Sequence, residues 1–168
     1  MAEFVVEKIT RLAASADEVW AHATRMDGVN AELMPLVRMT YPAEAKSLSI
    51  ADAPTGEFLF NSLLLAFGVL PFDVHRLRLA HVGPGRSFRE DSTTWLQRRW
   101  QHERWVEDDG AGCTVRDRVT VTPRLGFTTP MVRGIVRFVF AHRHRRLAAR
   151  FGAEVAPRSP ARHETPAP

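Results

Sequence analysis

In residues 114 to 122, every second side chain is Thr or Arg, and the side chains between them are Val or Asp. This alternation is the pattern of a β-strand with one exposed and one buried face. Val115, Val119 and Val121 fall on the apolar face. Asp117 falls on the same face, where a carboxylate is costly unless a partner compensates its charge. The segment therefore predicts a strand that carries one paired carboxylate into the protein interior.

The preceding run, residues 95 to 107, is predicted to be the first arm of a hairpin with this strand. A loop made of residues 108 to 111 would place His102 directly opposite Asp117, with the two Cβ atoms about 4.5–5.5 Å apart. Trp100 would lie on the same face as His102. A carboxylate beside an imidazole can orient one tautomer, as a general base requires. His102 and Asp117 are therefore a candidate catalytic pair, and the alternative is an internal ion pair that only fixes strand register.

Two further polar residues bear on this choice. Arg104 points inward by the same parity and could pair with Asp117 or with Glu90, which would make the cluster a salt-bridge network. Glu90 follows Phe88 on one face of another predicted strand. Glu90 either joins His102 in an inward polar cluster or lies in solvent on an edge strand, and the sequence leaves both arrangements open.

Length and composition predict one soluble domain. The chain has 168 residues, with 45% hydrophobic and 25% charged residues, which is ordinary for a globular protein. Its one cysteine, Cys113, excludes an internal disulfide framework and suits a reducing compartment. The first residues do not resemble a signal peptide, and the longest apolar run, residues 63 to 70, is too short to span a bilayer. We therefore expect a cytoplasmic protein without stable membrane insertion.

The basic charge is concentrated in one predicted helix near the C-terminus. The net charge is +4, and six arginines of this helix contribute much of it: Arg133, Arg137, Arg143, Arg145, Arg146 and Arg150. They lack adjacent base-stacking aromatics or a reading motif, so we expect no nucleic-acid partner. We expect the arginines to lie on the solvent face of the helix. The alternative is an interaction surface for an acidic partner, a membrane surface or a nucleic acid.

The remaining elements predict an α+β fold. A helix over about 16–24 begins after a capping box formed by Ser15 and Glu18, and a second short helix ends near Leu33. A long amphipathic helix is predicted from Pro130 to Phe151. The predicted strands cover about 4–12, 37–41, 57–66, 72–82, 86–91, 95–107 and 112–123, with a loop region at 42–56. Such a curved antiparallel sheet would wrap around the long C-terminal helix and enclose a cavity.

Residues 1–152 are thus predicted to form one domain, and residues 153–168, which contain four prolines, a disordered tail. The apolar run of residues 63 to 67 suggests either burial on both strand faces or a surface shared with a partner, so both a monomer and a homodimer remain open. His142 and His144 are about 200° apart around their helix and cannot share a metal ion. No metal or other cofactor is expected.

The order of elements, the Phe88-x-Glu90 and Trp100-x-His102 motifs, the Asp117 strand and the Arg/His-rich residues 140–147 resemble the SRPBCC superfamily. This helix-grip group includes lipid-transfer START domains, the birch-pollen allergen and polyketide cyclases, and the resemblance covers about residues 3 to 152. It implies a cavity between sheet and helix for a lipid-, polyketide- or aromatic-like molecule. The residues expected to contact this ligand are Phe88, Glu90, Trp100, Arg104, Val119 and Phe140. The alternative implied function is a polyketide cyclase/dehydratase-type enzyme, in which His102 acts as the base and Asp117 orients it.

Overall fold

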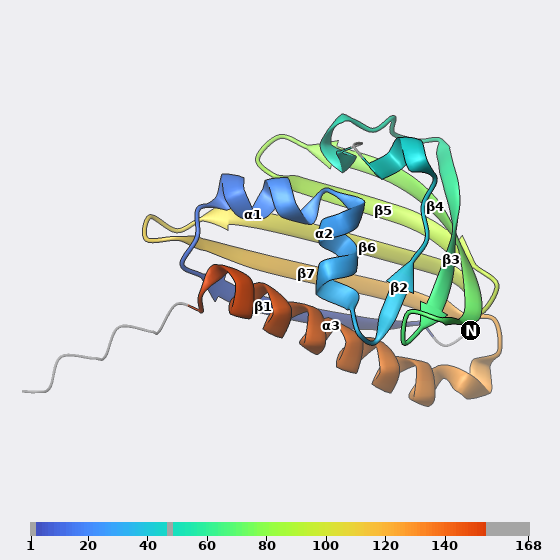
Figure 1. Cartoon of the computed structure of the whole chain (residues 1–168). Helices are drawn as coiled ribbons and strands as arrows, with labels where there is room; N and C mark the ends of the chain where they lie inside the picture. Colours follow the sequence, from blue (N-terminus) through green and yellow to red (C-terminus); the bar gives the residue numbers. More distant parts are fainter. Residues whose placement is uncertain (1–2, 47–48, 154–168) are drawn as a thin grey trace, which may run out of the picture.

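Seven antiparallel strands form one strongly curled sheet in the computed structural model, which describes residues 3–46 and 49–153 (Figure 1). The strands are β1 (Phe4–Leu12), β2 (Val37–Met39), β3 (Phe58–Ala66), β4 (Leu70–Gly83), β5 (Ser87–Thr94), β6 (Gln97–Asp108) and β7 (Cys113–Pro123). Their order across the sheet is β1-β7-β6-β5-β4-β3-β2, so the first strand pairs with the last. β5 is therefore an interior strand of the sheet.

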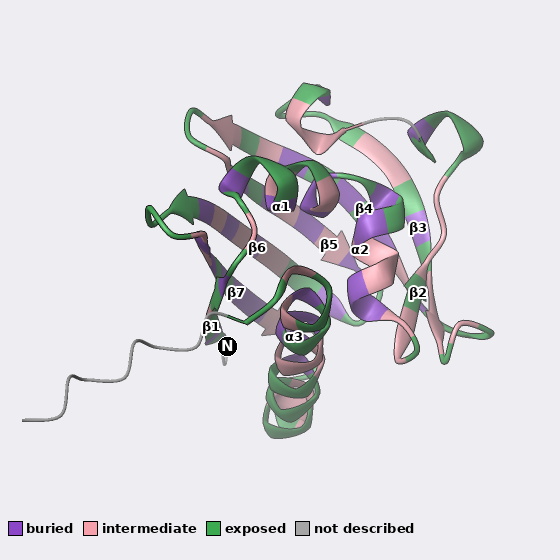
Figure 2. Cartoon of the chain, turned by 60° about the vertical axis from the view of Figure 1, so that its left-hand side comes forward, coloured by how far each residue is buried: buried purple, intermediate pink, exposed green. Residues whose placement is uncertain are grey.

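Three α-helices lie on the same face of this sheet (Figures 1 and 2). They are α1 (Ala16–Ala23), α2 (Met26–Leu33) and α3 (Thr129–Phe151), and the short 3₁₀ turns are η1 (Ala43–Lys46), η2 (Ile50–Asp52) and η3 (Gly126–Thr128). Ser15 caps α1 by accepting a hydrogen bond from the backbone of Glu18, as the capping box predicts. α3 ends at Gly152, whose positive φ of 75° suits glycine.

The predicted fold class is confirmed: a curled antiparallel sheet holds a long C-terminal helix, and two short helices follow the first strand. No helix in the described part of the chain is both long and apolar enough to cross a membrane. The predicted tail begins at Ala153, which forms a bridge with Leu12, and residues 154–168 lie outside the described residues.

The predicted register between β6 and β7 is wrong by two residues. Asp108 pairs with Cys113, so the loop comprises residues 109–112. The Asp108 and Asp109 carboxylates hold this loop, because they accept hydrogen bonds from the backbone N–H groups of glycines within it. A shift of two keeps every side chain on its predicted face, but it changes the residue that each one opposes.

The new partners alter the polar centre of the fold. Arg104, and not His102, lies directly opposite Asp117, while His102 lies opposite Val119.

A second correction concerns α3. Arg143 and His144 are buried, whereas all the helix arginines were expected on the solvent face.

Two apolar clusters flank these buried polar residues. The first packs Leu147 of α3 against the end of the sheet near α1, with Leu12, Val19, Val106 and Val115. The second packs Val136 and Phe140 of α3 against Phe4, Val6, Val119 and Val121. Arg143 and His144 lie between them along the buried stripe of α3. The fold therefore encloses a polar layer between two apolar ones.

Candidate functional site

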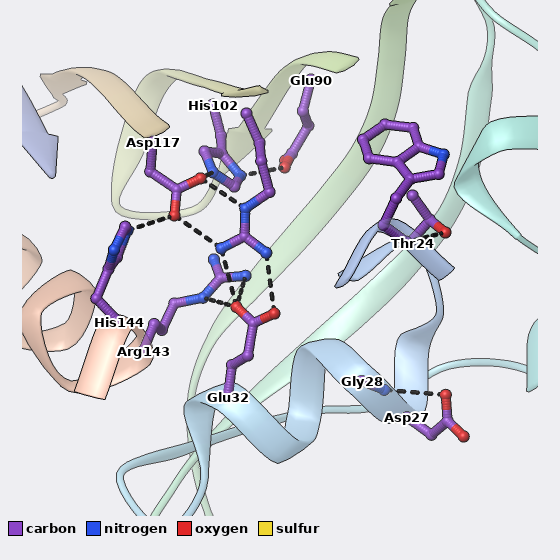
Figure 3. Close-up of polar contacts among 11 residues, drawn as sticks. Thr24, Asp27, Gly28, Glu32, Glu90, His102, Asp117, Arg143 and His144 are labelled. Carbon is purple, nitrogen blue, oxygen red and sulfur yellow. Dashed lines mark hydrogen bonds and ion pairs between the residues drawn. The ribbon is translucent and has the colours of Figure 1, made fainter. Parts of the chain in front are cut away.

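Asp117 is the centre of a buried hydrogen-bond network (Figure 3). Its carboxylate accepts 2.7 Å hydrogen bonds from both Nε and Nη2 of Arg104. It also accepts hydrogen bonds from His102 Nε2 at 2.8 Å and from His144 Nε2 at 2.9 Å. Asp117 is wholly inaccessible to solvent, so these four donors replace the water that would otherwise surround its charge.

Arg104 links this carboxylate to a second one on α2. Its Nη1 and Nη2 atoms each donate a 2.9 Å hydrogen bond to Glu32, while Arg143 of α3 donates to Glu32 from Nε at 2.9 Å. Two carboxylates thus face two guanidinium groups in a layer that joins α2, the sheet and α3 (Figure 3).

The buried ion pairs fix the charges of this layer. Burial alone would raise the pKa of Asp117, but Arg104 and His102 hold that pKa well below its ordinary value. Burial likewise opposes ionisation of Glu32, and Arg104 and Arg143 lower its pKa below the ordinary value. Both carboxylates are therefore ionised at neutral pH, and the pKa of Arg104 is raised by them despite its burial.

A second polar group lies beside this layer and involves Glu90, which is buried on β5. Glu90 pairs with His102 in register, and its Oε2 lies 3.9 Å from His102 Nδ1. On its other side, Oε1 contacts His75 Nε2 of β4 at 2.5 Å. Burial would raise the pKa of Glu90, but the contact with His75 lowers it below the ordinary value. We call His75, Glu90 and His102 the polar floor.

The protonation of His102 follows from its partners. Asp117 is ionised and can only accept, so His102 donates its Nε2 hydrogen to that carboxylate. Burial lowers the pKa of His102 below its ordinary value of 6.5, against the opposing influence of Asp117. A neutral imidazole at pH 7 then carries its free lone pair on Nδ1, on the side of Glu90.

A pocket of about 270 Å³ lies between the sheet and the helices, above this polar floor. The polar floor and Arg143 contribute polar atoms to it, together with Asp73, Thr94 and Gln97. Its walls are mostly apolar and include Met26, Leu33, Leu59, Leu64, Leu77, Leu79, Phe88, Trp100, Met131, Val132, Ile135, Val136, Val139 and Phe140. The described residues contain no group of three or more His, Cys, Asp or Glu side chains arranged to hold a metal ion.

The structure brings five of the eight residues predicted for ligand binding or catalysis to this pocket. Those that line it are Phe88, Glu90, Trp100, His102 and Phe140. Arg104, Val119 and Asp117 do not line it. These three side chains are fully buried, because Arg104 and Asp117 are enclosed by their ion pairs and Val119 packs in the apolar cluster under α3.

Four polar residues of the site were missed by the sequence analysis: Glu32, His75, Arg143 and His144. For His75 a signal was present, since Asp73, His75, Leu77 and Leu79 alternate inward along β4. Glu32 lies on a short helix of mixed polarity, in which nothing distinguishes a buried glutamate from an exposed one.

Comparisons with known proteins agree with this architecture. The family described as Domain of unknown function (DUF8410) matches residues 10–151. No curated protein matches the chain in sequence.

Several solved structures share the fold at low sequence identity. The Zhui aromatase/cyclase from Streptomyces sp. R1128 superposes with a TM-score of 0.65 at 12% identity, over 89% of this chain and 93% of that one. A START superfamily protein from Mycobacterium smegmatis gives 0.62 at 12% identity, over 88% and 96%. Norcoclaurine synthase from Thalictrum flavum, in complex with dopamine and hydroxybenzaldehyde, gives 0.56 at 12% identity, over 91% and 90%. These similarities establish the helix-grip fold of SRPBCC proteins.

Proposed function

The chain belongs to the family described as Domain of unknown function (DUF8410) and has the SRPBCC helix-grip fold, and on that premise we propose that it binds a hydrophobic small molecule between the sheet and α3. The observation that carries the proposal is the pocket, with apolar walls and a polar floor at one side. Ligand sites commonly combine such walls with a few polar groups that fix ligand orientation.

The pocket also suggests what kind of ligand it takes. Its volume of about 270 Å³ is close to the lower end of small-molecule sites, at roughly 300 Å³. Glu90 is ionised and can accept a hydrogen bond, whereas the walls are mostly apolar. We therefore propose a compact lipid-, polyketide- or aromatic-like molecule that carries a hydroxyl or another donor toward the polar floor.

Native mass spectrometry of freshly purified protein tests this proposal. We expect a small-molecule adduct that is lost on denaturation. Val139→Trp fills the pocket from α3 and should abolish the adduct, while Val5→Trp places the same side chain on the exposed face of β1 and should leave it. An adduct of equal occupancy in the Val139→Trp variant would contradict binding in the pocket.

The state of His102 supports a second candidate, an enzyme of the cyclase/dehydratase type. The neutral imidazole lines the pocket with a free Nδ1 and is oriented by Asp117 at 2.8 Å. In this role Nδ1 removes a carbon-bound proton from a ketone, which leaves an enolate and an imidazolium. Glu90 and Asp117 lie on either side of the imidazole and stabilise that positive charge.

Proton exchange of a compact ketone tests this second function without knowledge of the natural substrate. With 2-tetralone in D₂O, wild-type protein should accelerate deuterium incorporation next to the carbonyl, as measured by proton NMR. His102→Gln should remove the acceleration, whereas His81→Gln, on β4 outside the pocket, should retain it. Exchange that is equally fast with His102→Gln would exclude His102 as the base.

A further inference from the structure

Exposed apolar side chains gather where the pocket opens. They come from three connections: the β3–β4 hairpin, the β5–β6 turn, and η3 with the first turns of α3. We call the following residues the mouth rim: Phe67, Val69, Trp95, Phe127, Met131 and Ile135. Between 54% and 82% of each of these residues is exposed, which is unusual for large apolar side chains in such number.

The three connections lie at the same end of the molecule (Figure 1). Arg124 joins two of them, because its backbone N–H donates to the carbonyl of Leu96 at 3.0 Å and its guanidinium donates to the carbonyl of Thr94 at 3.1 Å. Residues from all three border the same pocket, namely Phe72, Leu96 and Met131. Met131 and Ile135 of the mouth rim line the pocket themselves, and the other four members lie on the same three connections.

The exposed charges of the three connections have a single sign, and Asp73 beside them is buried and accepts hydrogen bonds from Thr94, Trp95 and Leu96. Residues 63–72, 95–98 and 124–138 contain no aspartate or glutamate, but they contain Arg98, Arg124, Arg133 and Arg137. All four arginines are exposed. The first turn of α3 also lacks an acidic residue, so the partial positive charge of the helix N-terminus is not neutralised there.

We propose that the mouth rim docks on the surface of an anionic lipid bilayer. Aromatic and aliphatic side chains insert at the boundary between headgroups and acyl chains, and tryptophan favours that interface. The arginines beside them are attracted to anionic headgroups. A second copy of the chain fits less well, because a two-fold contact through this surface places the same four arginines against each other.

Docking in this orientation turns the mouth of the pocket toward the lipid. A hydrophobic ligand then passes between membrane and pocket without crossing water. The docking itself goes beyond the proposed function, since it depends on the mouth rim and not on an occupied pocket.

Flotation with lipid vesicles tests the proposal on the full chain. We expect binding to vesicles of equal parts phosphatidylcholine and phosphatidylserine at low salt, with weak binding to phosphatidylcholine alone. The double substitution Phe67→Ser and Phe127→Ser should lower partitioning by about tenfold or more. Ile9→Ser is the matched control, because Ile9 is 53% exposed on β1, away from the pocket, and should leave partitioning unchanged.

Variants of the arginines and of the pocket separate the contribution of charge to membrane docking from that of ligand binding. Arg133→Gln with Arg137→Gln should weaken binding to anionic vesicles only. Val139→Trp should still dock, so a failure of ligand binding and a failure of docking are distinguishable. Absence of binding to anionic vesicles would overturn the proposal. A second result would also overturn it: light scattering shows a dimer, the Phe67/Phe127 variant is monomeric, and the wild-type protein does not bind vesicles. The mouth rim would then be an interface with a second copy of the chain.

Discussion

Arg104 and Asp117 lie directly opposite each other on β6 and β7, and the guanidinium donates two 2.7 Å hydrogen bonds to the carboxylate. The same guanidinium donates two hydrogen bonds to Glu32 on α2. Arg104 therefore contacts both carboxylates, and its charge joins helix α2 to the sheet. None of the three side chains has access to solvent that could replace a lost partner.

Replacing Arg104 should therefore be strongly destabilising. Arg104→Met leaves Asp117 and Glu32 with fewer compensating charges in a buried layer, and removal of one partner from such a layer costs about 3–5 kcal/mol. We expect a loss of this size in the free energy of unfolding, measured by urea denaturation. Arg116→Met, which removes an exposed pair with Glu7, should cost less than about 1 kcal/mol. Equal losses for the two variants would show that the buried pairs contribute no more than the exposed one.

Stability should decrease as the pH falls, in two stages. The pKa of His102 is lowered on folding, so below about pH 6.5 the unfolded chain binds a proton that the folded protein resists. The pKa values of Asp117, Glu32 and Glu90 are also lowered, so a steeper loss begins below about pH 4.5. Each contribution is fully present above the unfolded-state pKa and is lost toward the folded-state pKa. Urea denaturation between pH 7.5 and about 2.5 measures both stages.

Two histidines contribute to the upper stage, because burial lowers the pKa of His22 as well as that of His102, and substitution of His102 separates its share. His102→Gln should reduce the pH dependence of the unfolding free energy between pH 6.5 and 5, whereas His81→Gln at an exposed position should leave it unchanged. An identical pH profile in wild type and His102→Gln would mean that the buried imidazole is not held neutral.

Glu90 should select ligands by their polar group. An ionised carboxylate in the pocket can accept a hydrogen bond from 2-naphthol but gains nothing from naphthalene. Glu90→Gln should weaken 2-naphthol binding by about tenfold, the value of a hydrogen bond to a charged group, with little effect on naphthalene. Fluorescence titration measures both affinities, and Glu103→Gln on the opposite face of the sheet is the control. A similar loss for both ligands would indicate a change in pocket shape instead.

Much of the fold could be predicted from local patterns. β1 has the predicted bounds, and the alternation of β7 places Asp117 inward together with Val115 and Val119. Ser15 caps α1 through a hydrogen bond from Glu18, three residues on, and Gly152 ends α3 through its own positive φ. Such features are visible in a sequence because the residues that determine them are close together along it.

The partners inside the polar layer could not be predicted in the same way. The register of β6 and β7 depends on which aspartate side chains hold the loop, and two-residue shifts leave the apolar pattern intact. Glu32 and Arg143 meet through the packing of α2 on α3, at a separation of 111 residues. The burial of Arg143 depends on that meeting, since without a carboxylate opposite it the same arginine would belong on the solvent face.

The central claim is that the pocket above the polar floor binds a compact hydrophobic molecule, and methyl NMR during a titration with 2-naphthol tests it most directly. Methyl signals of the pocket-lining Leu33, Leu77 and Val132 should shift and saturate at one equivalent, while those of Val5 and Ile9 on the outer face of β1 stay fixed. Shifts that are absent, or that appear equally at Val5 and Ile9, would contradict binding in the pocket.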